Sequence, residues 1–88
     1  MELLTVLSWG IVFMKLAFVM INTVPDQMES VLEKIEKVDG VKEAYMLYGV
    51  YDIIAMVETK TIKKLREVVL SIRTAINIKS TLTLTVVR

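Results

Sequence analysis

Two residue types that often carry out catalysis, His and Cys, are absent from the 88 residues of this chain. The commonest general base, the commonest metal ligand and the nucleophilic thiol are therefore all missing. Asp and Glu are present, but the sequence contains no clustered acid pair. The sequence therefore predicts a protein that binds or assembles and is not an enzyme, and we expect no metal and no cofactor.

The charges of the chain are nearly balanced, with 11 Lys and Arg residues against 10 Asp and Glu residues and a net charge of +1. Nucleic-acid binding normally needs a basic face, so we expect no direct contact with nucleic acid. A domain of this size buries a limited share of its surface, and without Cys it has no disulfides. Association with other copies is the expected source of additional stability.

Residues 1–15 differ in composition from the rest of the chain. No residue from Leu3 to Met14 is charged, and Lys15 then interrupts the apolar run. The run is shorter than the roughly 17–25 residues of a membrane span, and no clear signal-peptide cleavage site follows it. Three interpretations stay open: an extension upstream of a true start at Met14, a strand or helix that packs on an oligomer, or a weak membrane anchor. The composition break favours the first interpretation. We expect one domain over residues 16–88, located in the cytoplasm.

The first half of this domain reads as a strand followed by a helix. The segment 16–23 is apolar and rich in strand formers. Pro25 ends the strand and suits the first turn of a helix, where Asp26 and Glu29 match the helix dipole. Gly40 marks the end of this helix. Apolar residues recur along it at spacings of three and four: Met28, Val31, Leu32, Ile35 and Val38.

The second half begins with two strand-like segments, 41–48 and 51–58, which are separated by a tight turn at Gly49. Strands joined this closely pair antiparallel, as a hairpin. Thr59 or Thr61 can then cap a second helix. Its expected apolar stripe consists of Ile62, Leu65, Val69, Ile72 and Ala75 or Ile76.

A last segment, 78–87, alternates as a strand does. The order strand, helix, strand, strand, helix, strand predicts an α+β domain of the ferredoxin-like βαββαβ type. In that fold a four-stranded antiparallel sheet carries two helices on one face. The domain covers nearly the whole chain.

Apolar residues point to both faces of the expected sheet, although two helices can cover only one face. Phe18 and Met20 oppose Val19 and Ile21 on the first strand, and the other strands repeat this pattern. Monomers rarely expose such a surface. We therefore expect a homodimer in which two copies pair through the sheet face that the helices do not cover, that is, dimerising through the sheet. The alternative is that the N-terminal extension covers this face.

The expected hairpin carries the most specific pattern in the chain. It reads VKEAY over 41–45 and LYGVYD over 47–52. A V-x-x-A-Y strand followed by G-x-Y-D resembles the RAM domain (regulation of amino-acid metabolism), the effector-binding half of Lrp/AsnC transcription regulators. The T-x-T of Thr81 and Thr83 is similar to the last strand of that family. The resemblance covers residues 16–88. Too few residues precede it for the helix-turn-helix of the full-length regulators, so the chain resembles a stand-alone RAM protein.

The resemblance implies dimers, higher rings of dimers and an effector, usually an amino acid, bound between dimers. The ligand-binding residues that it implies are Tyr48, Gly49, Val50, Tyr51 and Asp52 on the hairpin loop, with Thr81 and Thr83 on the last strand. The Asp52 carboxylate would accept from the ammonium group of the ligand, while loop N–H groups and Thr hydroxyls would donate to its carboxylate. Gly49 would allow close backbone approach and a positive φ, and the tyrosines would form a wall of the pocket.

Alternatives to this interpretation remain open. Gly49 and Asp52 are also ordinary turn residues, and threonines are ordinary strand residues. The tyrosines would also suit an interface between subunits. At the level of function, the alternatives are an ACT-like regulatory module and an enzyme of the dimeric α/β-barrel kind. Full-length Lrp/AsnC regulators are the expected partners beside further copies of the chain.

Overall fold

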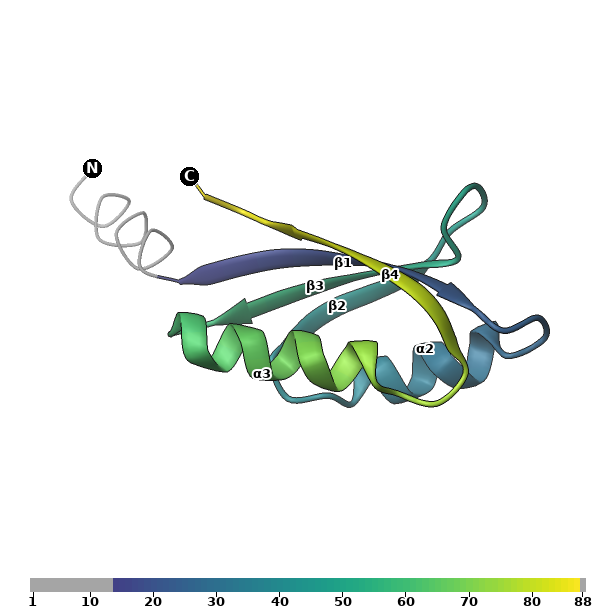
Figure 1. Cartoon of the computed structure of the whole chain (residues 1–88), viewed down its shortest axis with the longest axis horizontal. Coiled ribbons are helices and arrows are strands. Elements are labelled where there is room, and N and C mark those ends of the chain that lie inside the picture. Colours follow the sequence, from purple (N-terminus) through teal and green to yellow (C-terminus); the bar gives the residue numbers. More distant parts are fainter. Residues whose placement is uncertain (1–13, 88) are drawn as a thin grey trace.

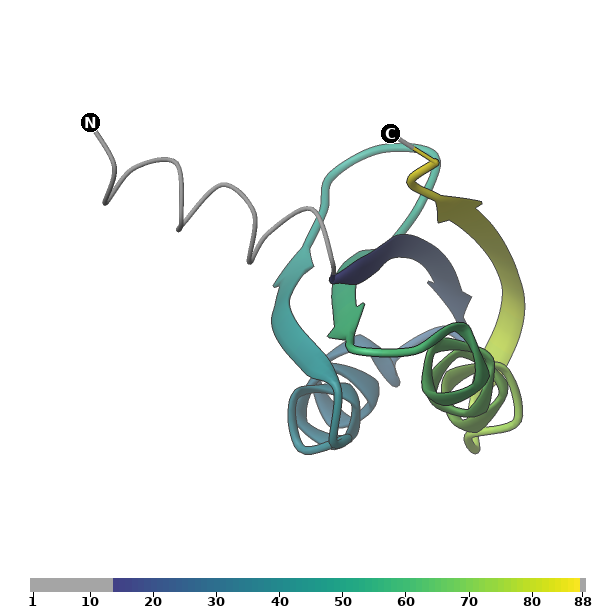
Figure 2. The same ribbon diagram turned by 90° about the vertical axis from the view of Figure 1, so that its left-hand side faces the viewer.

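The computed structural model describes residues 14–87, so most of the expected N-terminal extension lies outside the described residues. The sheet has the strand order β2-β3-β1-β4 with antiparallel pairing throughout. Both helices lie side by side on one of its faces (Figures 1 and 2). The predicted α+β, ferredoxin-like fold is confirmed. Its elements are β1 (Lys15–Thr23), α2 (Met28–Glu36), β2 (Val41–Met46), β3 (Ile53–Thr59), α3 (Ile62–Arg73) and β4 (Ile78–Thr85).

The core lies between the sheet and the two helices. β1 runs through the middle of the sheet, and every second side chain on it is fully buried, from Ala17 to Ile21. Their register partners on β3 are buried as well. The period of two places the alternate residues on the opposite face. The helices add Val31, Ile35, Leu65, Val68 and Ile72 to this core.

The predicted apolar stripe of the first helix is confirmed, but that of the second is partly wrong. Leu65, Val68 and Ile72 face the core, a spacing of three and four that follows one helix face. Ile62 in the first turn and Ile76 beyond the helix end are 41% and 65% exposed. The buried face of α3 has Val68 at its centre. Ile62 and Ile76 lie outside this face, so they remain exposed.

Helix α2 begins later than its sequence predicts. Pro25 and Asp26 form a turn that Gln27 closes by donating its N–H to the Val24 carbonyl over 3.1 Å. Asp26 has φ +68°, and Pro followed by a residue of positive φ is the pattern of a type II turn. A residue in this left-handed conformation does not continue an α-helix. The helix therefore starts at Met28, and Pro25 is not in its first turn.

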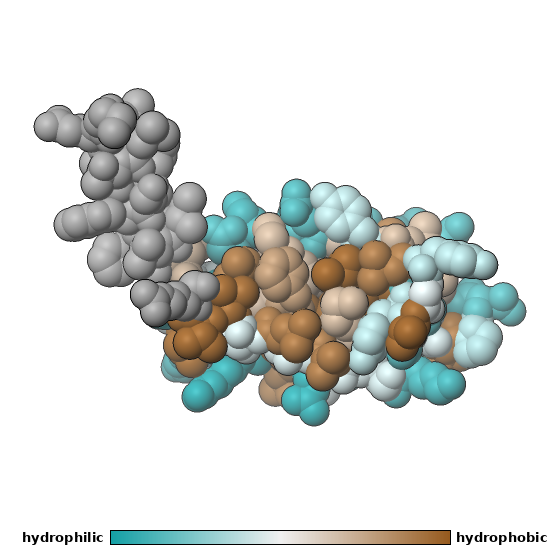
Figure 3. All heavy atoms as spheres, turned by 90° about the horizontal axis from the view of Figure 1, so that it is seen from above, coloured by the Kyte–Doolittle hydropathy of each residue, from teal (hydrophilic) through white to brown (hydrophobic). Residues whose placement is uncertain are grey.

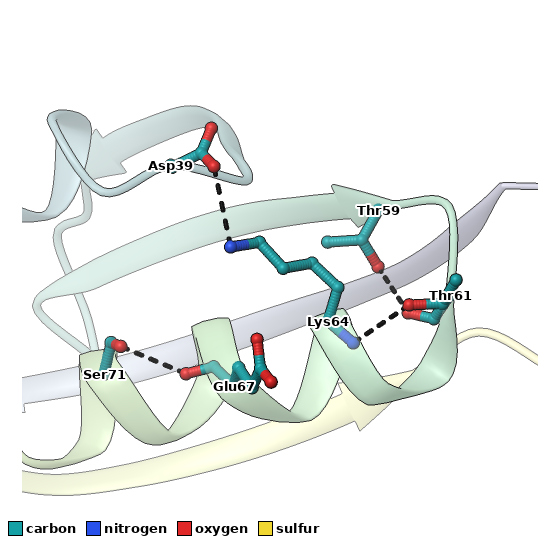
Figure 4. Close-up of polar contacts among 6 residues, drawn as sticks. All are labelled: Asp39, Thr59, Thr61, Lys64, Glu67 and Ser71. Carbon is teal, nitrogen blue, oxygen red and sulfur yellow. Dashed lines mark hydrogen bonds and ion pairs between the residues drawn. The ribbon is translucent and has the colours of Figure 1, made fainter.

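Helix α3 is capped as the sequence predicts, at Thr61. The Thr61 hydroxyl accepts a hydrogen bond from the Lys64 N–H over 3.1 Å (Figure 4). The other candidate, Thr59, donates its hydroxyl to the Thr61 carbonyl over 2.8 Å. The two threonines therefore form one connected start for the helix.

No helix within residues 14–87 is both long enough and apolar enough to cross a bilayer.

The face of the sheet that carries no helix, here called the open face, is largely apolar. Looking down on it, Figure 3 shows hydrophobic side chains spread across the strands. The register places Phe18 between Met56 and Leu84, and Met20 between Ile54 and Leu82. Leu82 and Leu84 are 44% and 52% exposed. The predicted surplus of apolar strand surface is therefore present.

Candidate functional site

The loop that joins β2 to β3 is longer than predicted. β2 ends at Met46 and β3 begins at Ile53, so the connection is the six-residue segment 47–52 and not a tight turn at Gly49. The Leu47 N–H closes it by donating to the Asp52 carbonyl over 2.7 Å. Figure 1 shows the loop rising from the end of the sheet at which β1 also finishes, away from the two helices. Here it is called the β2–β3 loop.

Asp52 ties this loop to the end of β1. Its N–H donates to the Ile21 carbonyl over 2.9 Å. Its carboxylate oxygen Oδ2 accepts from the Thr23 N–H over 2.8 Å and from the Thr23 hydroxyl over 3.3 Å. Thr23 is itself buried. Asp52 therefore connects the segment after β2, through its carbonyl, with β1, through its N–H and its side chain.

The tip of the β2–β3 loop projects into solvent. Tyr48 and Val50 are fully or almost fully exposed, at 108% and 85%, and Gly49 has no heavy atom near the position of a Cβ. Tyr51 is half-buried beside Asp52. The expectation of a positive φ at Gly49 is wrong, because the one glycine with positive φ in the described chain is Gly40. At the tip, exposed side chains and open backbone groups surround a glycine that is not strained.

Within one chain, the loop and the two threonines do not converge. Thr81 and Thr83 pair with Ile21 and Val19, so they lie on the helix-bearing side of the sheet. Thr81 is at the same end of the sheet as Asp52, but β1 runs between them. Thr83 lies further along β4. The structure therefore divides the predicted ligand-binding residues into two groups.

Thr83 belongs to a different hollow, between α3 and the edge strand β4. This open cavity has a volume of about 310 Å³ and is lined by Leu65, Arg66, Val69, Leu70, Arg73, Thr83 and Thr85. Two guanidinium groups give it a positive character. These arginines were not predicted as site residues, although a spacing of seven places two residues on the same face of a helix.

Among the described residues, a tyrosine at the β2 edge of the open face has a shifted pKa. The charge of Glu43 raises the pKa of the Tyr45 phenol above its usual range, and a hydrogen bond to the same carboxylate adds to this effect. A phenol whose pKa is raised stays neutral at physiological pH. Tyr45 therefore contributes an uncharged ring to the open face, next to Ile54 in the register.

Chemically, the β2–β3 loop offers acceptors and donors but no catalytic pair. Within residues 14–87, Asp52 uses Oδ2 for Thr23, which leaves Oδ1 as an acceptor. The N–H groups from Tyr48 to Tyr51 donate to no other described residue. No group of three or more acidic side chains in the described part of the chain is placed to hold a metal ion. The loop therefore presents one carboxylate oxygen and several N–H groups that are not used by other described residues.

The residues that hold this end of the sheet together were not predicted from the sequence. Nothing local marks Thr23 as the partner of Asp52, which is 29 positions away. Asn77 has φ +67°, accepts from the Val24 N–H through its carbonyl over 2.9 Å, and donates its side-chain amide to Gln27 over 3.3 Å. Asn tolerates this left-handed conformation, so an Asn directly before the last strand was a usable signal.

A family model described as the Lrp/AsnC ligand binding domain matches residues 16–88. Three solved structures are also similar. FFRP-DM1 is 36% identical with a TM-score of 0.78, covering 83% of this chain and 99% of that chain. TTHA0845 from Thermus thermophilus is 31% identical with a TM-score of 0.79, covering 84% of this chain and 94% of that chain.

The third structure is AsnC of E. coli, which is 34% identical with a TM-score of 0.75 over 84% of this chain and 51% of AsnC. This chain therefore spans about half the length of AsnC, while it matches FFRP-DM1 over almost the whole of that protein. No significant match was found among curated proteins.

Proposed function

This chain belongs to the family of Lrp/AsnC ligand binding domains, and from that membership we propose that it binds a free amino acid as an effector. The proposed activity is binding and not catalysis. The observation that carries the proposal is the β2–β3 loop, which Asp52 holds to β1 while its tip stays open. Family membership favours this function over the ACT-like module and the barrel enzyme considered from the sequence.

Each part of an amino-acid zwitterion has a partner in the proposed site. The Oδ1 atom of Asp52 accepts from the ammonium group, in a charge-assisted bond stronger than a neutral one. The N–H groups around Gly49 donate to the carboxylate of the ligand. The aromatic rings of Tyr48 and Tyr51 flank its side chain. Because Asp52 is already anchored by Thr23, its carboxylate is oriented before the ligand arrives, which reduces the cost of ordering on binding.

The two threonines enter this proposal from a neighbouring copy. Thr81 and Thr83 lie on the helix-bearing side of their own sheet, so a site that contains them together with the loop is formed between subunits. The proposed assembly begins with a homodimer through the open face and continues to rings of dimers. The same open face would accept a full-length regulator of the family as an alternative partner.

The proposal is tested by thermal unfolding in the presence of each of the twenty amino acids. A ligand at about 100 times its Kd adds about 2.7 kcal/mol to the free energy of unfolding. For a domain this small, that is a rise in Tm of about 10 °C or more. One or a few amino acids should produce such a rise. If none of the twenty shifts Tm, the proposal is wrong.

A substitution at Asp52 separates binding from structure. Asp52→Asn retains an oxygen that can accept from Thr23 but removes the negative charge that the ammonium group needs. We expect the affinity to fall at least about tenfold, which is about 1.4 kcal/mol, while Tm without ligand changes little. Asp39→Asn, at an exposed carboxylate distant from the loop, is the matched control and should bind as the unmodified chain does. Unchanged affinity in Asp52→Asn would remove this residue from the site.

A further inference from the structure

The near-zero net charge of the chain conceals two oppositely charged halves. Segment 26–58 contains eight acidic and three basic residues, a net charge of −5. Segment 60–79 contains six basic residues and one acidic residue, a net charge of +5. In the fold, the first half supplies α2 and the second supplies α3. α2 itself contains three acidic residues and one basic residue, and α3 contains four basic residues and one acidic residue. The two helices, which lie side by side in Figure 2, therefore carry opposite net charge.

On each helix, the charges form a stripe with the same spacing. Glu29, Glu33 and Glu36 follow each other at intervals of four and three on α2, and all are exposed. Arg66 and Arg73 on α3 are also exposed, and they are seven positions apart, as are the outer two glutamates. Seven residues of helix span about 10.5 Å. The acidic stripe and the basic stripe therefore match in length, two turns each.

The two stripes lie on opposite flanks of the helix layer. Glu29 lines a surface hollow together with Met46 of β2, whereas Arg66 and Arg73 line the cavity beside Thr85 of β4. β2 and β4 are the two edge strands of the sheet. The acidic stripe therefore faces outward at the β2 edge and the basic stripe faces outward at the β4 edge.

Contacts inside the chain do not neutralise the two stripes. Within residues 14–87, the one ion pair joins Lys64 of α3 to Asp39 after α2, with 3.6 Å between Nζ and Oδ2. Figure 4 shows the Lys64 side chain crossing from its helix toward Asp39. This pair joins the first turn of α3 to the segment between α2 and β2, and it involves no residue of either stripe. Arg66 and Arg73 have no carboxylate partner in the described part of the chain, and the apolar Leu70 between them is 57% exposed.

We propose that the acidic stripe of one copy docks on the basic stripe of the next copy. Glu29 and Glu36 then face Arg66 and Arg73, and the aliphatic part of Glu33 covers Leu70. The contact joins two different surfaces, so each copy still presents one unused stripe to a further copy. Such a heterologous contact builds rings when its rotation closes and open filaments when it does not.

This contact differs from the proposed dimer in its surface and in its physics. It uses the helix flanks and leaves the open face of the sheet untouched, so it depends neither on the open-face dimer nor on ligand binding. Exposed ion pairs are individually weak, and charges more than about 8 Å apart are screened at physiological salt. The contact is therefore weak and salt-sensitive, and several copies must act together to hold the assembly.

The test uses two charge-reversed variants, Arg66→Glu/Arg73→Glu and Glu29→Arg/Glu36→Arg. In the first variant both stripes are acidic, and in the second both are basic, so neither variant docks on itself. In a mixture, the acidic stripes of one variant meet the basic stripes of the other at every contact. Sedimentation velocity at low salt should show the large assembly for the unmodified chain and for the equimolar mixture, but not for either variant alone.

A matched control keeps the change of net charge and avoids the stripes. Lys42→Glu/Lys79→Glu alters the net charge by the same amount as Arg66→Glu/Arg73→Glu at two other exposed positions, and it should assemble as the unmodified chain does. Raising the salt concentration should dissolve the charge contact while any sheet-mediated dimer persists. Circular dichroism checks that each variant is folded.

Three results would overturn the proposal. The first is an unmodified chain whose assembly does not change with salt. The second is a mixture of the folded variants that stays as small as its components. The third is assembly that survives Arg66→Glu/Arg73→Glu while binding to a short DNA duplex is lost, which would assign the basic stripe to nucleic acid. Loss of the open-face dimer alone leaves the salt-sensitive contact intact and contradicts only the dimer.

Discussion

At the level of single residues, Gly40 meets the clearest backbone requirement in the described chain. It ends the segment after α2 with φ +102°, and a Cβ added there would lie 2.7 Å from Cγ2 of Val68. Side chains disfavour that conformation, and Val68 of α3 is buried in the core, where it has little room to move. The glycine therefore permits both the turn into β2 and the close packing of α3.

This requirement gives a prediction for Gly40→Ala. The strained φ and the contact with Val68 should lower the free energy of unfolding by about 1–3 kcal/mol, measured by urea denaturation. Gly49→Ala is the control, because nothing lies within 4 Å of its Cβ position and its effect should stay within about 0.5 kcal/mol. Similar losses at both glycines would show that the left-handed turn at Gly40 is not the cause.

At the level of elements, α3 depends on the way it starts. Its first turn contains two lysines, Lys63 and Lys64, and no acidic residue, although the N-terminus of a helix favours negative charge. The Thr61 hydroxyl compensates by accepting from the Lys64 N–H. α2 has no side-chain cap of this kind at Gln27, so the two helices begin by different means.

Removal of the cap should weaken α3 in particular. Thr61→Ala should lower the free energy of unfolding by about 1 kcal/mol, because the Lys64 N–H loses its acceptor. Thr61→Ser retains the hydroxyl and should cost much less. Urea denaturation measures both, and hydrogen exchange of the first amides of α3 locates the effect. Equal stability of the Ala and Ser variants would contradict the role of the hydroxyl.

At the level of the whole molecule, the fold leaves one face of the sheet without helices and exposes apolar side chains on it. Alternate residues of a strand point to opposite faces, and the helices cover one face only (Figure 2). The central strand therefore presents Phe18 and Met20 outward, next to Leu82 and Leu84 of β4. A contiguous apolar surface of this kind marks an interaction site, which supports the proposed pairing of two copies through it.

The dimer proposal predicts the effect of a charge placed on the open face. Leu82→Asp should convert the dimer into a folded monomer at micromolar concentrations, because an unpaired carboxylate would be buried in the interface. Sedimentation equilibrium measures the change. Ile76→Asp replaces an apolar residue that is also exposed but lies outside the strands, and it should leave the dimer intact. Dimers of equal strength in both variants would place the interface elsewhere.

Much of the fold and part of the candidate site were predictable from local patterns. The period of two in β1 and the spacing of three and four in α2 identified their elements and the residues facing the core. The hairpin motif predicted Asp52 as a ligand-binding residue, and in the structure its carboxylate accepts a hydrogen bond from the Thr23 N–H. Its role toward a ligand stays a prediction. These inferences succeed because periodicity and turn chemistry act between neighbours in the sequence.

Other features were decided only by contacts between distant segments. Asp52 ties the β2–β3 loop to Thr23 of β1, 29 positions away in the sequence, and the register of β1 with β4 turns Thr81 and Thr83 to the helix side. Likewise, the two charged stripes lie on opposite flanks of the helix layer because α2 packs near β2 and α3 packs near β4. The sequence by itself determined which residues form strands and helices, because those depend on bonds and burial repeated every few residues. The tertiary structure alone decided which surfaces they share, because hydrogen bonds across the sheet select one register among many that local patterns allow.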